Sequence, residues 1–223
     1  MHSVFVYYII RLTIEKWYNE KLISEDEYCY LLSSLISAIP YVSNITGVYG
    51  AYLKFWDKRT YNDLKLEEPQ ITSSRFKSKT FNEDCNTLLP KIKADVLYAD
   101  PPYNARQYLP NYHILETIAK YDYPEIKGVT GLRDYTNQKS EFCQISTVKS
   151  AFEQMIENAN VKYVMISYNN EGLLSTEELS EICKKYAKQG TFKLIEIDYR
   201  RYKSKIPNNE KGLKEHIYFF EKE

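Results

Sequence analysis

A short apolar run that ends in two prolines constrains the fold of this chain more than any other stretch. Residues 96–99 read Val-Leu-Tyr-Ala and are followed by Asp100-Pro101-Pro102-Tyr103. A run rich in β-branched and aromatic residues is typical of a buried strand, and prolines end it because they cannot donate to a sheet ladder. Asp100 is therefore predicted at the C-terminal tip of a strand, the edge at which open α/β sheets bind ligands.

These four residues suit the activation of an amine. The exocyclic amine of a nucleobase is a poor nucleophile because its lone pair is delocalised into the ring. The Asp100 carboxylate and the Pro101 carbonyl would accept its two N–H bonds and favour a tetrahedral geometry, while the Tyr103 ring stacks on a base taken out of the helix. Taken alone, the four residues are equally well explained by a strand that ends in a proline turn.

The stretch resembles the catalytic tetrapeptide of amino-methyltransferases, which transfer a methyl group from S-adenosylmethionine to N6 of adenine or N4 of cytosine. An aspartate in first place resembles the adenine branch. Residues 104–118, 130–133 and 139–143 extend the match to bacterial DNA adenine methyltransferases of restriction–modification systems, and the resemblance covers about residues 47–202. It implies an α/β fold with a Rossmann-like, S-adenosylmethionine-dependent methyltransferase sheet, S-adenosylmethionine as the cofactor and DNA as the partner.

Two regions are expected along the chain: a helical N-terminal segment over residues 1–70 and, by the resemblance, the catalytic domain over residues 71–223. Ser24 and Glu27 form a capping box before a helix that Pro40 ends. The other elements expected are a helix over residues 48–58, a short strand ending at Asp84, helices over residues 112–118 and 175–188, and strands over residues 162–166, 192–198 and 215–220, the last two paired in a hairpin.

Composition limits the classes of function. The formal net charge is zero, so any contact with nucleic acid depends on local clusters of basic residues. The four cysteines have no paired spacing and the three histidines stand apart, so we expect neither a metal site nor a disulfide framework. Neither a membrane span nor a signal peptide is evident near the N-terminus, and a cytoplasmic protein without a membrane partner is expected.

By the resemblance, Asp84, Cys85 and Asp100 belong to the methyl-donor site, and Asp84 would accept the amino group of the donor's adenine. An aspartate at this position is also a typical helix N-cap. The group binds the methionine part of the donor with a glycine-rich Phe-x-Gly-x-Gly turn, yet no two of the seven glycines here are separated by one residue. Three explanations stay open: first strands that lie outside this sequence, so that the sheet is incomplete at its N-terminus, a second polypeptide that supplies the motif, or another mode of donor binding.

Several side chains are candidates for contact with nucleic acid. Arg106 and Gln107 lie just beyond the predicted active strand, within reach of phosphates or base edges. By the resemblance, the loop after the strand at 162–166 walls the pocket of the flipped base, which makes Tyr168 and Asn169 candidates, although a loop that caps the next helix explains them equally. The densest basic run adds Arg200, Arg201 and Lys203, and a solvated hairpin turn is its alternative.

The expected function is site-specific methylation of adenine N6 in DNA, with Asp100, Pro101, Pro102 and Tyr103 as the catalytic residues. Two alternatives remain open. The missing glycine turn favours a non-catalytic DNA-binding remnant or the subunit of a split methyltransferase. The same tetrapeptide would also serve an RNA adenine methyltransferase.

Overall fold

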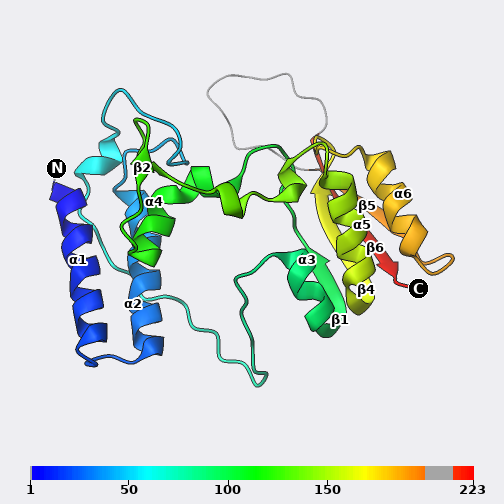
Figure 1. Cartoon of the computed structure of the whole chain (residues 1–223), viewed down its shortest axis with the longest axis horizontal. Coiled ribbons are helices and arrows are strands. Elements are labelled where there is room, and N and C mark those ends of the chain that lie inside the picture. The colour runs from blue at the N-terminus through cyan, green and yellow to red at the C-terminus, as the bar shows by residue number, and fades with distance from the viewer. Residues whose placement is uncertain (1, 199–212) are drawn as a thin grey trace. The chain divides into compact units, whose positions relative to one another are not determined.

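The structure is a computed structural model that describes residues 2–198 and 213–223. It divides into two compact units, drawn together in Figure 1. The helical unit comprises residues 1–78 and 108–138, and the sheet unit comprises residues 79–107 and 139–223. The chain thus enters the sheet unit, returns to the helical unit after Gln107 and enters the sheet unit again at Lys139. This division differs from a single boundary near residue 70.

The helical unit is built on α1 (His2–Asn19), α2 (Glu25–Ala38) and α4 (Tyr108–Lys120), with a small hairpin of β2 (Ile126–Lys127) and β3 (Leu132–Arg133). The capping box before α2 is confirmed, because the Glu27 N–H donates to the Ser24 hydroxyl at 3.3 Å and the Ser24 N–H donates to the Glu27 carboxylate at 2.7 Å. The helix ends just before Pro40, as predicted. The core of this unit contains Ile14, Leu35, Ile39, Ile45 and Tyr49.

The predicted helix over residues 48–58 is wrong. This segment consists of turns and bends, and only a short 3-10 helix, Lys58–Tyr61, follows it. The backbone of its first turn is engaged elsewhere: the Tyr49 N–H donates to the Asn111 carbonyl at 2.7 Å. Gly50 packs so closely on Pro110 that an added Cβ would lie 2.8 Å from its carbonyl oxygen. This segment therefore packs on residues 110–111 as a turn and does not form a helix.

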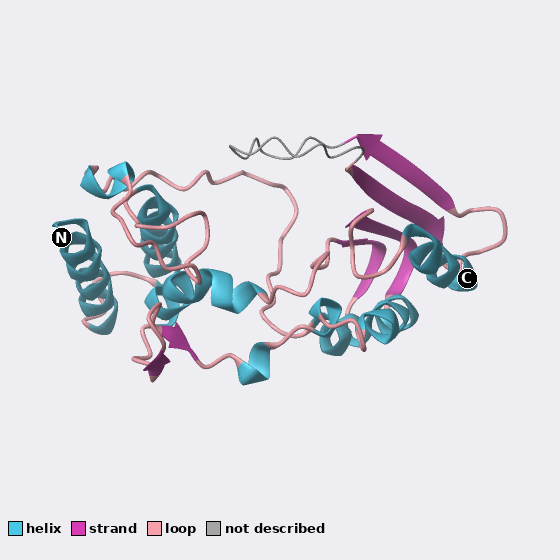
Figure 2. Cartoon of the chain, turned by 90° about the horizontal axis from the view of Figure 1, so that it is seen from above, coloured by secondary structure: helices cyan, strands magenta, loops and turns pink. Residues whose placement is uncertain are grey.

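The sheet unit contains one four-stranded mixed sheet, seen from above in Figure 2. Its strands are β1 (Lys93–Ala99), β4 (Asn160–Asn169), β5 (Lys193–Asp198) and β6 (Lys214–Glu221), in the spatial order β1-β4-β6-β5. β1 runs parallel to β4, and the other neighbours are antiparallel. The strands predicted over residues 96–99, 162–166, 192–198 and 215–220 are confirmed, as are the antiparallel pairing of the last two and the α/β class.

One face of this sheet is packed against α5 (Val148–Asn158) and α6 (Thr176–Tyr186). We call it the covered face, and its central residues, all 0% exposed, are Val164, Ile166, Tyr168, Tyr218 and Phe220. The capping box predicted at the start of α6 is confirmed between Ser175 and Glu178. The covered face and these two helices form the core of the sheet unit.

The opposite face, which we call the open face, carries the alternate residues of the same strands. Its apolar side chains include four that are about half exposed: Val96 49%, Tyr98 58%, Ile195 48% and Ile197 49%. No described element of the sheet unit covers them. The prediction that residues 96–99 form a strand is confirmed, but the expectation that this strand is buried is wrong on the open face.

Candidate active site

Asp100 directly follows β1, so its predicted position at the C-terminal tip of a strand is confirmed. Its side chain is exposed, Pro101 is buried, and Pro102 and Tyr103 are half-buried. The two prolines leave the sheet ladder as expected, because neither has an N–H to offer. The strand and its diproline end therefore fix where the carboxylate stands at the edge of the sheet.

A polar network surrounds this carboxylate. The Tyr103 hydroxyl lies 2.8 Å from Asp100 Oδ1 and 3.0 Å from Glu215 Oε1, so both carboxylates are within reach of its hydrogen. The Ser167 hydroxyl donates to the same Glu215 oxygen at 2.8 Å. These groups come from β4, β6 and the turn after β1, which the sheet brings together.

Ser167 and Glu215 were not among the residues predicted from the sequence. One signal was available, because Ser167 directly follows the strand expected over residues 162–166 and Glu215 begins the strand expected over residues 215–220. The antiparallel register that pairs Asn169 with Glu215 then places Glu215 beside the end of β4. Only the register between the two strands, which the sequence does not reveal, brings Glu215 to Tyr103.

The Tyr103 phenol is neutral in this setting. Its burial raises its pKa above the usual value, and the hydrogen bond to the Asp100 carboxylate raises it further. A neutral phenol remains a hydrogen-bond donor throughout the physiological pH range. Tyr103 therefore donates to carboxylates here and does not act as a base.

The Tyr168 ring packs against the Tyr103 ring in the core of the sheet unit. It is 0% exposed and packs edge-on against the Tyr103 ring, with centroids 5.5 Å apart, and against the Phe152 ring at 5.4 Å. Its hydroxyl accepts the Leu173 N–H at 2.9 Å. Gly172 leaves the space for this ring, because an added Cβ would lie 2.0 Å from it. The buried Tyr168 ring has no surface to offer to a nucleotide.

The segment before β1 does not contain the strand predicted to end at Asp84. Asp84 is instead the N-cap of the short helix α3 (Cys85–Leu88), and its Oδ1 accepts the Thr87 N–H at 3.0 Å. The alternative of an N-cap is therefore confirmed. The side chains of Asp84 and Cys85 are exposed.

The remaining candidates fall into three environments. The exposed Arg106 lies in the turn after the tetrapeptide, whereas the Gln107 side chain is engaged at both ends with the Ser140 backbone, at 2.8 and 3.1 Å. Asn169 is half-buried, and its side chain accepts the Glu171 N–H at 3.0 Å. Arg200, Arg201 and Lys203 lie outside the described residues.

Within the described part of the chain, no group of three or more His, Cys, Asp or Glu residues could hold a metal ion. None of the described helices has the length and apolar content needed to cross a bilayer.

A comparison with protein families identifies the chain. The model of the D12 class N6 adenine-specific DNA methyltransferase family matches residues 5–182. The chain belongs to this family. The match spans both units, and it includes residues 100–103 and Ser167, although not Glu215.

The chain is also similar to individual methyltransferases. It is 50% identical to the type II methyltransferase M.FokI of Planomicrobium okeanokoites and 45% identical to the modification methylase StsI of Streptococcus sanguinis, over 96% of this chain in each case. It is 40% identical to the type II methyltransferase M.NlaIII of Neisseria lactamica over 90% of this chain. The chain spans 33%, 33% and 58% of these three relatives. No solved structure matches it.

Proposed function

We propose that this chain carries the catalytic and base-binding half of a site-specific DNA methyltransferase, which transfers a methyl group from S-adenosylmethionine to N6 of adenine in a restriction–modification system. The observation that carries the proposal is the exposed Asp100 carboxylate at the tip of β1, followed by two prolines and Tyr103, in a member of the D12 class. An acid at the carboxyl end of a parallel strand lies where α/β sheets bind ligands.

The proposed chemistry depends on orientation more than on acid–base catalysis. The Asp100 carboxylate accepts one N–H of the target amine and the Pro101 carbonyl accepts the other, which aims the nitrogen lone pair along the line of attack. Pro102 keeps the turn rigid, and Tyr103 stacks on the flipped base. When bound, the donor would supply the methyl group from a positively charged sulfur, which keeps the electron pair of the broken S–C bond and leaves as a neutral thioether. The surplus proton of the methylated amine then leaves past the exposed Asp100 carboxylate to water.

The donor site is proposed at Asp84, Cys85 and Asp100. One oxygen of Asp84 accepts the Thr87 N–H at 3.0 Å, but a carboxylate has acceptor capacity for further donors, and the Asp84 side chain is exposed. It is therefore able to accept the amino group of the donor's adenine while it caps α3. Cys85 would contribute packing and its backbone, and Asp100 would border the transferred methyl group.

The contacts with DNA are proposed for residues around this edge and in the basic run after β5. Arg106 is exposed and suits a phosphate. Gln107 would have to release the Ser140 backbone in order to read a base edge, and Asn169 would border the flipped base. Arg200, Arg201 and Lys203 complete the proposed contact. Tyr168 takes part only through the support that it gives to Tyr103.

Phosphate contacts predict a measurable salt effect. Replacing Arg200 and Arg201 together with alanine should weaken binding to all DNA sequences alike and reduce the slope of log affinity against log salt concentration by about 2. The double variant Lys188→Ala with Lys193→Ala, which also removes two exposed lysines of the sheet unit, is the matched control. An unchanged slope in the Arg200 and Arg201 variant would favour the alternative interpretation, in which this basic run is solvated and does not contact DNA.

The exposed apolar residues of the open face are consistent with a further polypeptide layer on the sheet. A sheet face with Val96, Tyr98, Ile195 and Ile197 about half exposed has apolar surface that a further layer would bury. The outer edge of β1 has no paired strand among the described residues. We propose that a polypeptide segment with the glycine-rich donor-binding turn, in the same chain or a separate one, packs on this face and extends the sheet beyond β1.

The decisive experiment follows tritium transfer from labelled S-adenosylmethionine to unmethylated plasmid DNA, with N6-methyladenine identified after hydrolysis. It is run with the chain alone and with an added glycine-rich half of a D12 class relative. Asp100→Ala should lower the rate at least about 1,000-fold, because the amine loses its oriented acceptor.

Asp95→Ala is the control, since Asp95 is another exposed aspartate of β1. Equal activity of the Asp100 variant, or no transfer by the wild type in either preparation, would refute the proposed function. Preferential methylation of RNA in a competition would replace DNA with RNA as the substrate.

A further inference from the structure

Two carboxylates compete for one hydrogen at the C-terminal edge of the sheet. The Tyr103 hydroxyl oxygen lies 2.8 Å from Asp100 Oδ1 and 3.0 Å from Glu215 Oε1. A phenol has a single hydrogen, so it cannot make a full hydrogen bond to both acceptors at once. The pKa of Tyr103 is raised by burial and by its bond to Asp100, so this hydrogen stays on the phenol at neutral pH.

Glu215 is held in place without the help of Tyr103. The Ser167 hydroxyl donates to Glu215 Oε1 at 2.8 Å, and Ser167 itself is only 6% exposed on β4. Glu215 is half-buried, and the hydrogen bond from the buried Ser167 restricts where its carboxylate lies. Glu215 therefore offers Tyr103 an acceptor whose place does not depend on Asp100.

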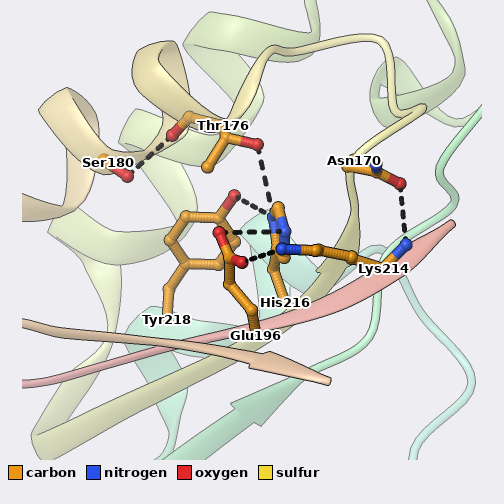
Figure 3. Close-up of polar contacts among 7 residues, drawn as sticks. All are labelled: Asn170, Thr176, Ser180, Glu196, Lys214, His216 and Tyr218. Atoms are coloured by element: carbon orange, nitrogen blue, oxygen red, sulfur yellow. Dashed lines mark hydrogen bonds and ion pairs between the residues drawn. The ribbon is translucent and has the colours of Figure 1, made fainter. Parts of the chain in front are cut away.

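The backbone on either side of Glu215 is anchored on the covered face (Figure 3). The Lys214 N–H donates to Asn170 Oδ1 at 3.0 Å, and the Lys214 ammonium pairs with the Glu196 carboxylate. On the other side, the His216 ring is 2% exposed. It contacts the hydroxyls of Thr176 at 3.3 Å and Tyr218 at 3.4 Å. The contacts of Lys214 and His216 thus hold the start of β6 in place, while the Glu215 side chain points to the open face.

We propose that Glu215 is a positioning residue that holds the Tyr103 ring in place while Asp100 exchanges the phenol for the amine of the target adenine. This inference rests on the proposed function. In the free protein Asp100 accepts the phenol hydrogen. When the amine arrives, the phenol donates to Glu215 alone, so the ring keeps its place against the base and Asp100 is released for the substrate.

The first test is a double-mutant cycle on steady-state methyl transfer by the full chain, in whichever preparation is active. Glu215→Ala should lower kcat about 10- to 100-fold, the size of a lost hydrogen bond to a charged acceptor, and should change KM for DNA less than about twofold. Glu215→Gln should recover most of this loss, because its amide oxygen still accepts the phenol.

The cycle is closed in the Tyr103→Phe background, where no hydroxyl remains for Glu215 to hold. There Glu215→Ala should change kcat less than about twofold. Glu177→Ala, which removes an exposed glutamate of the sheet unit, should leave kcat unchanged. If the losses of Glu215→Ala and Tyr103→Phe multiply, or if Glu215→Gln is as slow as Glu215→Ala, Glu215 does not act through Tyr103.

A second test needs no activity. The chain is labelled with 3-fluorotyrosine, and the Tyr103 signal in the ¹⁹F spectrum is assigned by its loss in Tyr103→Phe. Glu215→Ala should shift and broaden this signal, Ser167→Ala should shift it less, and Glu177→Ala should not move it. An unmoved signal in Glu215→Ala would overturn the inference even if methyl transfer is established, whereas an inactive wild type with a shifted signal would count against the proposed function alone.

Discussion

The two faces of the four-stranded sheet are built from the same strands and are both apolar, yet only one is buried. Val164 and Ile166 on the covered face are 0% exposed, whereas Val96 and Ile195 on the open face are 49% and 48% exposed. Alternate residues of a strand point to opposite faces, so apolar content on both faces indicates a sheet with layers on both sides. The described residues of the sheet unit supply only one of these layers.

This difference separates two roles of apolar residues. On the covered face they stabilise the chain by itself, at roughly 1.5 to 3 kcal/mol for each large side chain that is fully buried. On the open face, much of the free energy of burying apolar side chains is gained only when another layer binds and covers them. Substitutions on the first face should therefore act on folding, and substitutions on the second should act on association.

The largest effect on folding is expected for Phe152→Ala. The Phe152 ring is 0% exposed and packs edge-on against Phe142 and Tyr168, with centroids 5.1 and 5.4 Å apart. Its loss should lower the free energy of unfolding by about 3 to 5 kcal/mol, measured by urea denaturation followed by circular dichroism. Tyr98→Ala on the open face is the control and should cost less than about 1 kcal/mol. Equal costs would mean that the two faces do not differ in burial.

Gly172→Ala should have the next largest effect. A methyl group at this position would lie 2.0 Å from the Tyr168 ring, so the ring must move within a packed core. The expected cost is about 1 to 3 kcal/mol, read from the urea midpoint at a constant m-value. In a Tyr168→Leu background the added methyl group should cost little, and a cost that persists there would place the strain in the backbone instead.

Alkaline pH should destabilise the covered face. Burial raises the pKa values of the Tyr168 and Tyr218 phenols above 10, their usual value when unfolded. The unfolded chain therefore releases these protons first, so the stability contributed by the neutral phenols is present below pH 10 and is lost as pH rises above it. At pH 10.5 Tyr218 should cost about 0.8 kcal/mol of unfolding free energy, and Tyr168 should act in the same direction. Urea unfolding of the double variant Tyr168→Phe with Tyr218→Phe should show a flatter pH dependence, and an unchanged one would contradict this.

The smallest effect on folding is expected on the open face. Val96→Thr and Ile195→Thr should each change the free energy of unfolding of the chain alone by less than about 0.5 kcal/mol. Together they should weaken binding of the added glycine-rich half of a D12 class relative at least about tenfold, measured by calorimetry. Unchanged binding would place the partner elsewhere on the molecule.

Local signals in the sequence predicted local structure well. The two capping boxes and the position of Asp100 after β1 depend on residues within one or two turns of the chain, and all three are confirmed. The hairpin of β5 and β6 was also predicted, from two successive strands, and its antiparallel pairing is confirmed. The capping boxes and the diproline end of β1 depend on neighbouring residues, and the hairpin pairs two strands that follow each other in the chain.

Contacts between distant segments decided the rest. The helix expected over residues 48–58 is replaced by turns and bends whose start contacts the distant Pro110 and Asn111. Tyr168 was expected in a polar loop, but packing against Phe152 and Tyr103 buries it. Glu215 lies 112 residues from Tyr103 in the sequence, and only the register of β6 against β4 brings the two together. The spacing of residues along the sequence does not predict these contacts.

The outer edge of β1 has a consequence for the behaviour of the chain in concentrated solution. Proteins protect unpaired edges with charged residues, and β1 has Lys93 and Asp95 in its first half but no charge from Val96 to Ala99. That second half is a template for a strand of another copy. Dimers or larger assemblies that form through it would place a foreign strand beside Asp100, so self-association and loss of activity should rise together with protein concentration.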